Sequence, residues 1–333
     1  PVPVMERAGE ITTVVDAVTR ARNGTGALLL VAGAAGGGKT TLVRAALDEV
    51  SGGVRRWWGA CDPLATPRPL GPWEDMALRE PALASVLHDS DPVSVGAGVL
   101  SLLAEPTVVV VEDVHWVDEA TVDLLLYLGR RLARCRAVLV LTHRPVEVDT
   151  QGQAARLLGV LARAPEAISI PLDPLSPDAV ARLAEGTGLD PTTLHARTGG
   201  NPFYVTEVLA DPARAVPGTV SDAVRARVAD LPVEGRELLD LVSLAPAGLE
   251  LAVATAILGA DTAHTALDQV GARGMATLDT GRIVFRHDLA RVAVAEAVPP
   301  GRRHQLHARL LEVLDAMPGV DPARLVHHAE LAD

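Results

Sequence analysis

The chain has 333 residues, a length that suits two or three domains, each with a core of its own. Its net charge of −12, without any run of more than two basic residues, argues against direct nucleic-acid binding by this segment. No stretch of 18 apolar residues and no secretory leader is visible, so we expect a cytoplasmic protein without a membrane partner. The chain does not begin with methionine, and we expect it to be a fragment of a longer protein.

The first recognisable unit is a strand, a glycine-rich loop and a helix. A helix is predicted from Ala8 to Arg22, followed by an apolar strand from Ala27 to Ala32. The loop GAAGGGKTT at 33–41 comes next and opens a helix that we expect from Thr41 to Val50. This order and the spacing G-x-x-x-x-G-K-[ST] are typical of a phosphate-binding loop.

The loop predicts a nucleotide site with a magnesium ion. Its backbone N–H groups and the following helix N-terminus suit phosphate oxygens. We expect Lys39, the only lysine of the chain, to reach the β- and γ-phosphates and the Thr40 hydroxyl to hold Mg²⁺. The predicted contacts with ATP or ADP in this segment come from Gly33, Ala35, Gly36, Gly37, Gly38, Lys39, Thr40 and Thr41.

Further strands alternate with helices up to residue 171. The predicted strands are 54–60, 107–111, 137–141 and 167–171, and the predicted helices are two within 73–104, one at 119–134 and one at 154–163. This alternation predicts an α/β fold with a doubly wound parallel sheet. The run TVVVV at 107–111 suits a central strand buried on both faces, and it ends directly in Glu112 and Asp113.

Ligands of such sheets bind at the carboxyl ends of the strands. Lys39, Glu112, Asp113 and Arg144 all follow strand ends, so we expect them to converge on one nucleotide. We predict that Trp57 and Trp58 pack in the interior. Cys61 and Cys135 lack metal-ligand spacing and are predicted to be buried, reduced thiols.

From residue 173 the pattern is helical. Short helices are predicted at 177–187, 191–198 and 202–210, a linker at 211–218, and further helices at 219–230, 234–244, 250–258 and 262–272. A hairpin of 275–278 and 282–285 follows, then a helix at 289–298 that Asp288 is expected to cap, which together suggest a winged helix. Helices at 301–316 and 321–332 complete the chain. The expected domains are 1–172 for nucleotide binding, 173–214 as a helical lid, 215–300 as the winged helix, and 301–333 as the start of a helical region.

Four spaced motifs carry a family resemblance. They are WWGACDPLATPRPLGP (57–72), VVVVEDVHWVDEAT (108–121), TGGNPFYVTEVL (198–209) and FRHDLARVAVAEAV (285–298). With the phosphate loop, the chain resembles the signal-transduction ATPases with numerous domains, abbreviated STAND. It resembles most closely the ATPase module of the large ATP-binding LuxR-type transcriptional regulators. The likeness extends over nearly the whole chain.

The resemblance implies roles for individual residues. Glu112 matches the Mg²⁺-side acid, which is aspartate in most relatives, and Asp113 matches the second acid, which orients the attacking water. Arg144 matches a sensor arginine near the γ-phosphate. Arg7 matches the arginine that lies near adenine in relatives, and Pro202 matches the proline that packs on the nucleoside. His287 matches the winged-helix histidine that contacts the ADP β-phosphate.

The resemblance therefore implies a slow ATPase that switches a regulator between ADP-closed and ATP-open states. The expected catalytic residues are Lys39, Glu112, Asp113 and Arg144, and the expected metal ligands are Thr40, Glu112 and Asp113. An unknown effector and self-association in the ATP state would be its partners. Two alternatives stay open, a replication-initiator-type ATPase that binds DNA through its winged helix and a small-molecule phosphotransferase.

Overall fold

The computed structural model describes residues 4–62, 68–88, 91–144, 152–210 and 220–332. The chain divides into two compact units, the first ending at Asp173 and the second beginning at Pro174. The predicted linker at 211–218 lies outside the described residues, as does much of the loop predicted at 61–72. None of the helices in the described ranges combines the length and apolar character that crossing a membrane requires.

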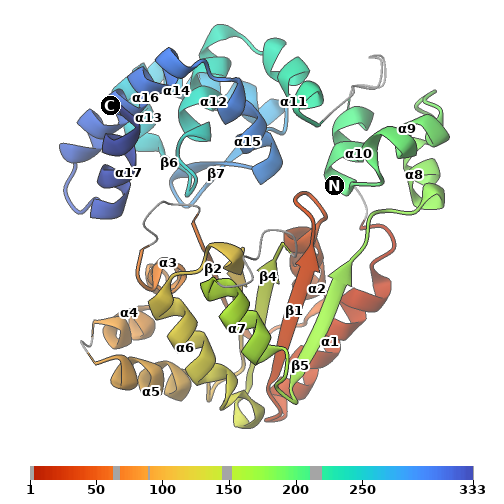
Figure 1. The fold of residues 1–333 in the computed structure, drawn as a ribbon, viewed down its shortest axis with the longest axis vertical. Helices are drawn as coiled ribbons and strands as arrows, with labels where there is room; N and C mark the ends of the chain where they lie inside the picture. Colours follow the sequence, from red (N-terminus) through yellow and green to blue (C-terminus); the bar gives the residue numbers. More distant parts are fainter. Residues whose placement is uncertain (1–3, 63–67, 89–90, 145–151, 211–219, 333) are drawn as a thin grey trace. The chain divides into compact units, whose positions relative to one another are not determined.

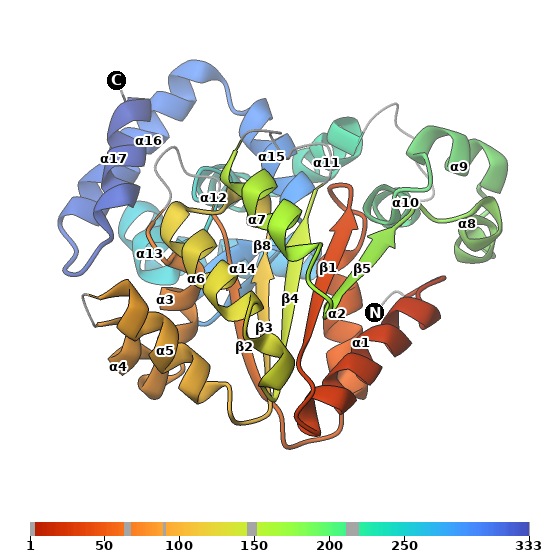
Figure 2. The ribbon, with the colours of Figure 1, turned by 60° about the horizontal axis from the view of Figure 1, so that its bottom comes forward.

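The first unit is built on a parallel sheet of five strands. The strands are β1 (Ala27–Gly33), β2 (Arg55–Ala60), β3 (Thr107–Glu112), β4 (Ala137–His143) and β5 (Ala167–Leu172). Their order across the sheet is β2-β3-β4-β1-β5, as Figure 2 shows. The chain passes from β1 to the edge strand β2, returns through β3 and β4, and then places β5 on the other side of β1, so the prediction of a doubly wound parallel sheet is confirmed.

Helices cover both faces of this sheet (Figure 1). Alternate residues of the strands enter two separate cores, for example Leu29 and Val31 on one face and Leu28 and Leu30 on the other. The first core is closed by α1 (Ala8–Arg22) and α2 (Lys39–Glu49). The second is closed by α3 (Gly71–Ala77), α4 (Pro81–Leu87), α5 (Pro92–Leu102), α6 (Glu119–Gly129) and α7 (Gln153–Leu161).

Several predicted helix boundaries in this unit are wrong. The region predicted as two helices contains three in the described residues, because Pro81 and Pro92 each stand at the first turn of a new helix. The helix predicted to end at Arg134 ends at Gly129, and a 3₁₀ turn at Leu132–Arg134 follows. The helix after the phosphate loop begins at Lys39, two residues earlier than predicted.

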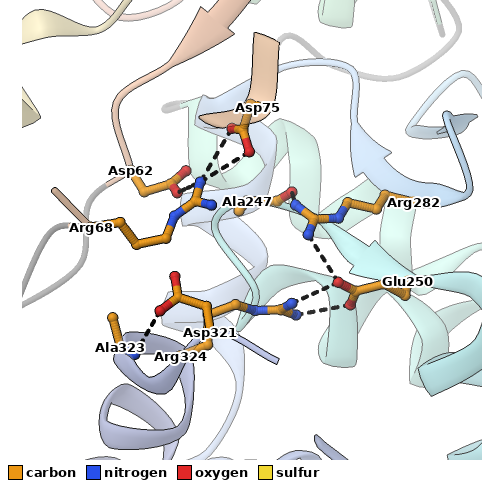
Figure 3. Close-up of polar contacts among 9 residues, drawn as sticks. All are labelled: Asp62, Arg68, Asp75, Ala247, Glu250, Arg282, Asp321, Ala323 and Arg324. Carbon is orange, nitrogen blue, oxygen red and sulfur yellow. Dashed lines mark hydrogen bonds and ion pairs between the residues drawn. The ribbon is translucent and has the colours of Figure 1, made fainter. Parts of the chain in front are cut away.

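Other local predictions are confirmed. Asp118 caps α6, since its Oδ1 accepts the Thr121 N–H at 2.9 Å. Cys61 and Cys135 are buried free thiols. Outside the sheet core, Arg68 donates to Asp62 at 3.1 Å and to Asp75 at 3.2 Å, so it ties the chain after β2 to α3 (Figure 3).

The second unit is helical with one small antiparallel sheet. Its helices are α8 (Pro177–Ala184), α9 (Pro191–Thr198), α10 (Pro202–Leu209), α11 (Val220–Ala229), α12 (Val233–Ser243), α13 (Leu251–Leu258), α14 (Ala260–Ala272), α15 (Asp288–Ala297), α16 (Pro300–Asp315) and α17 (Pro322–Ala332). The predicted hairpin is confirmed as β7 (Ala276–Asp279) and β8 (Arg282–Phe285). A third strand, β6 (Leu249–Glu250), pairs with β8 where a helix start was predicted.

Two features hold this second unit together. Phe203 of α10 lies in the same apolar core as residues of α12, α14 and α15. Glu250 accepts from Arg324 of α17 at 2.6 and 2.8 Å and pairs with Arg282 of β8 at 3.0 Å, which ties the last helix to the small sheet (Figure 3). The expectation that Asp288 caps α15 is wrong, because Asp288 is the first helical residue and its carboxylate accepts from Arg291 at 2.7 Å.

Candidate functional site: the carboxyl edge of the parallel sheet

The strand register brings the predicted site residues to one edge of the sheet. Ala60 of β2 lies opposite Glu112 of β3, and Ala32 of β1 lies opposite His143 of β4. Gly33, the first residue of the phosphate loop, lies opposite Leu172 at the end of β5. Parallel strands end at the same edge, so the loop, the two acids and Arg144 share one side of the first unit.

The conformation of the loop requires glycine at several positions. Gly36 and Gly38 have φ angles of 70° and 91°, a region that other residues seldom adopt. A Cβ on Gly37 would lie 3.0 Å from the Ala34 carbonyl oxygen, and one on Gly33 would lie 3.2 Å from the Leu172 Cβ. The loop thus forms a close backbone cradle, and α2 begins behind it without a side-chain cap. An anion in the cradle would satisfy the first N–H groups of α2.

Lys39 supplies the positive charge of this cradle. Its side chain is buried, and its Nζ donates to the carbonyl oxygens of Gly33 at 2.9 Å and Ala34 at 3.1 Å. These bonds hold the ammonium over the loop itself. The position suits an ammonium that would bind phosphate oxygens, as the sequence predicts.

The two acids have different surroundings. Glu112 is partly buried, and its carboxylate accepts from the Thr40 hydroxyl on one oxygen and from the Trp58 indole N–H at 2.9 Å on the other. Withdrawal from water raises the pKa of Glu112, while the two donors act against this shift. Thr40 and Glu112, both predicted metal ligands, therefore already touch. Hydroxyl and carboxylate oxygens are donors that Mg²⁺ prefers, so this pair fits the ion.

Asp113 occupies a strained turn directly after β3. Its φ and ψ of 54° and 47° lie in the left-handed region, which is uncommon for aspartate. The Asp113 N–H donates to the Thr142 hydroxyl at 3.0 Å, and its carboxylate lies 3.8 Å from Nδ1 of His115. Glu112 keeps the extended backbone of β3, whereas Asp113 has a left-handed backbone. The two acids therefore have different local geometry, which suits different tasks.

Three residues at this edge were not predicted as site residues from the sequence. Trp58, predicted as a packing residue, contacts Glu112, and Thr142 fixes the backbone of Asp113. His143 ends β4, where burial first, then the charge of Lys39, and then His115 lower its pKa to about 4. It is therefore a neutral imidazole close to Lys39 at neutral pH. A polar residue at a strand end was the available signal for Thr142 and His143.

The predicted arginines lie at the same edge. Arg7 is buried, and its guanidinium donates to the carbonyl oxygen of Asp173, the residue after β5. It also lies 3.7 Å from Glu10. Arg144 directly follows β4. The structure brings both toward the edge that carries the loop, and their predicted contacts with adenine and γ-phosphate stay predictions.

Pro202 and His287 belong to the second unit. Pro202 begins α10, which Asn201 caps by accepting the N–H groups of Phe203 at 3.1 Å and Tyr204 at 3.3 Å. The rings of Phe203 and His287 lie 4.6 Å apart, centroid to centroid. The two predicted nucleotide contacts are thus brought together within their own unit. Their contact with a nucleotide stays a prediction.

The fold and the loop define the first unit as a P-loop nucleotide-binding domain. Its residues 3–141 match the family model described as the AAA ATPase domain, which covers less than half of the chain. The chain resembles an uncharacterized protein of Rhizobium meliloti (strain 1021) with 28% identity over 68% of this chain and 24% of that protein. The chain therefore spans about a quarter of the length of this curated relative.

The fold is shared with a solved structure over most of this chain. The crystal structure of a STAND protein with a tetratricopeptide repeat sensor from Pyrococcus horikoshii superposes with a TM-score of 0.62 and 16% identity. The match covers 95% of this chain and 47% of that one. Cdc6p from Pyrobaculum aerophilum matches with a TM-score of 0.46 and 14% identity over 89% of this chain and 94% of its own. Residues 3–141 are thus similar to an AAA-type ATPase domain.

Proposed function

We propose that the chain is the ATP/ADP-binding switch module of a larger regulatory protein, and that it hydrolyses ATP slowly to reset the switch. The observation that carries the proposal is the contact between Thr40 and Glu112 beside the glycine cradle and Lys39. The carboxyl edge of the sheet thus combines a phosphate cradle, a buried cation and two oxygen ligands. The family model over residues 3–141 supports the same class of activity.

In this proposal each residue of the edge has one task. The loop and Lys39 bind and orient the phosphates, and Thr40 with Glu112 would hold Mg²⁺, which neutralises charge on the transferred phosphoryl group. Asp113 orients a water toward the γ-phosphate from its separate turn. Arg144 stabilises the charge that develops there, and Arg7 lies near the base. Hydrolysis is slow because its use is to reset a state.

The second unit supplies the switch. We propose that α8 to α10 form a lid and that α11 to α15 with the small sheet form a winged helix, with domains of 173–214 and 215–300. The ion pair between Glu207 of α10 and Arg227 of α11 links the two parts, and Arg227 also donates to the carbonyl oxygen of Arg273. With Phe203 in the shared core, these contacts favour a lid and winged helix that move as one body.

ADP would close this body over the nucleotide through Pro202 and His287, and ATP would release it for self-association. A ligand shifts such an equilibrium only through contacts that differ between the two states. In this proposal the site on the first unit would contact the nucleotide in both states, and Pro202 and His287 would contact it in the closed state. An effector and the output of a transcriptional regulator would lie in other parts of the larger protein.

The experiment is to denature the purified protein and identify the released nucleotide by chromatography, then to measure ADP and ATP binding by calorimetry. The switch predicts retained ADP and binding that depends on Mg²⁺. Lys39→Ala should abolish most binding. Arg156→Ala, which removes an exposed arginine paired with Asp123 at 3.3 Å, is the matched control and should bind as the wild type does. Wild-type affinity in Lys39→Ala would contradict the assignment of the site.

A further inference from the structure

The side chain of Trp58 lies on the same face of the sheet as the carboxylate of Glu112. Trp58 pairs with Val110 across β2 and β3, and Glu112 is two residues further along β3. Residues two apart on a strand point to the same side. Trp58 and Val110 both belong to the core that α1 and α2 close. The indole and the carboxylate therefore meet under the helix that carries Thr40.

Both oxygens of Glu112 have a donor from a different element. Oε1 accepts from Thr40 on α2, and Oε2 accepts from the Trp58 indole at 2.9 Å on β2. The backbone is held as well, since the Glu112 carbonyl accepts the Cys61 N–H at 2.9 Å. A glutamate side chain has three rotatable bonds. If only one carboxylate oxygen is held, the carboxylate can still turn about that oxygen. The indole removes that freedom.

The indole of Trp58 is itself held in place by a residue of α2. The guanidinium carbon of Arg44 lies 5.4 Å from the centroid of the Trp58 ring. Arg44 is four residues after Thr40 on α2, so both point from the same helix face. This contact fixes the ring plane and hence the direction of its N–H. The arrangement runs from α2 through Arg44 and Trp58 to Glu112 and returns to α2 at Thr40.

We propose that Trp58 is a positioning residue whose indole N–H sets the Glu112 carboxylate for the Mg²⁺ of a bound nucleotide. The inference rests on the proposed function of the same site. Trp58 does not touch the ion. It acts through Glu112, keeping Oε1 toward Thr40 and holding the longer glutamate side chain in one orientation. Groups that orient a metal ligand in this way commonly change metal affinity by tenfold or more when removed.

The test compares Trp58→Phe with Trp57→Phe in the intact chain. The first variant keeps an aromatic ring beneath Arg44 but removes the N–H and one of the two fused rings, and the second variant makes the same change in ring size. The second removes the neighbouring indole, which is 2% exposed, points to the other core and has no hydrogen-bond partner for its N–H among the described residues. ADP affinity is measured by calorimetry in EDTA and across a MgCl₂ titration. Mg²⁺ bound to free ADP is accounted for in each fit.

Trp58→Phe should need roughly tenfold more Mg²⁺ for the same gain in ADP affinity, with unchanged affinity in EDTA. Trp57→Phe should match the wild type in both measurements. Trp58→His, which keeps a ring N–H, should recover part of the loss. Wild-type Mg²⁺ dependence in Trp58→Phe would overturn the role of Trp58 while leaving the nucleotide site intact. Lack of ADP binding by the wild type would instead overturn the proposed function.

A second readout needs no folded Trp58 variant. Mg²⁺ added to the ADP-bound wild type should change the tryptophan fluorescence, because the ion alters the carboxylate that Trp58 contacts. Glu112→Asp shortens the side chain by one methylene and draws it away from the indole, so the fluorescence response should be lost while Trp57→Phe keeps it. A full response in Glu112→Asp would show that it arises elsewhere and would contradict the contact as the source of positioning.

Discussion

The ring of Phe203 lies 4.6 Å from the ring of His287, centroid to centroid, although the two residues lie far apart in the sequence of the second unit. Phe203 follows Pro202 in α10, and His287 stands immediately before α15. The contact therefore places His287 beside the residue that follows Pro202, and Pro202 and His287 are the two residues of this unit that the sequence assigns to nucleotide binding. In the proposed switch, this contact would couple α10 to the segment before α15 when a nucleotide binds.

The first prediction concerns His287. His287→Ala should weaken ADP binding by roughly 1.5–3 kcal/mol, and ATP binding by less, if the imidazole donates to a β-phosphate oxygen in the closed state. Hydrogen exchange over 275–298 should then increase in the ADP-bound protein. His264→Ala is the control, since this exposed ring bonds the Ala260 carbonyl of its own helix, at 2.7 Å. Equal weakening of both nucleotides would reduce His287 to a packing residue.

The second prediction separates the two acids. Asp113→Asn should slow ATP hydrolysis while ATP stays bound, because it removes the carboxylate that we propose orients water but keeps the turn. Glu112→Gln should instead raise the Mg²⁺ needed for binding. The two effects should not add, since both residues act beside one metal. Single-turnover rates and Mg²⁺ titrations distinguish the two. A wild-type hydrolysis rate in Asp113→Asn would take the water-orienting role away from it.

The third prediction concerns the Asp113 turn. Thr142→Val removes the hydroxyl that accepts the Asp113 N–H at 3.0 Å and keeps the buried shape of the side chain. An unsatisfied N–H in a strained turn costs about 1–3 kcal/mol. We expect a slower hydrolysis rate with unchanged ADP affinity. Thr107→Val is the matched control, because Thr107 begins the neighbouring strand β3 and its hydroxyl donates to the nearby Glu105 carbonyl at 2.9 Å. Equal ATP hydrolysis rates in the two variants would contradict a role of the Asp113 turn in hydrolysis.

The fourth prediction concerns acid and the last two helices. His307 of α16 and His328 of α17 are each 2% exposed, and their Nδ1 atoms lie 2.8 Å apart, so one ring donates and the other accepts. Burial first, then neighbouring positive groups, lower the pKa of His307 to about 4 and of His328 to about 3. Unfolded histidines take up protons near pH 6.5. Stability should therefore be complete above about pH 6.5 and fall as the pH drops toward 4.

Urea unfolding measures this dependence. Between pH 7 and pH 5 each buried histidine should cost roughly 2 kcal/mol of unfolding free energy. The double variant His307→Leu/His328→Leu should be less dependent on pH over this range. His304→Leu, at an exposed position of α16, should keep the wild-type slope. An unchanged slope in the double variant would mean that other groups control the acid response.

The sequence predicted the elements whose signals are local. The phosphate loop, the apolar run of β3 and the hairpin of β7 and β8 each carry their pattern within a few residues. The contact between Trp58 and Glu112 could not be predicted in this way, because it depends on the register of two strands 54 residues apart. The same holds for Thr142 and Asp113. Asp288 was misassigned because a carboxylate before a helix resembles a cap, whereas an arginine three residues later binds it.

The most direct test of the central claim is the affinity for Mg²⁺ and ADP in Lys39→Ala and Thr40→Ala beside the wild type. The switch account predicts that the purified wild type releases ADP on denaturation and rebinds it more tightly with Mg²⁺. Lys39→Ala should lose most ADP binding, and Thr40→Ala should lose mainly the Mg²⁺-dependent part. A protein that contains no nucleotide and whose ADP affinity is unchanged by both substitutions would contradict the account.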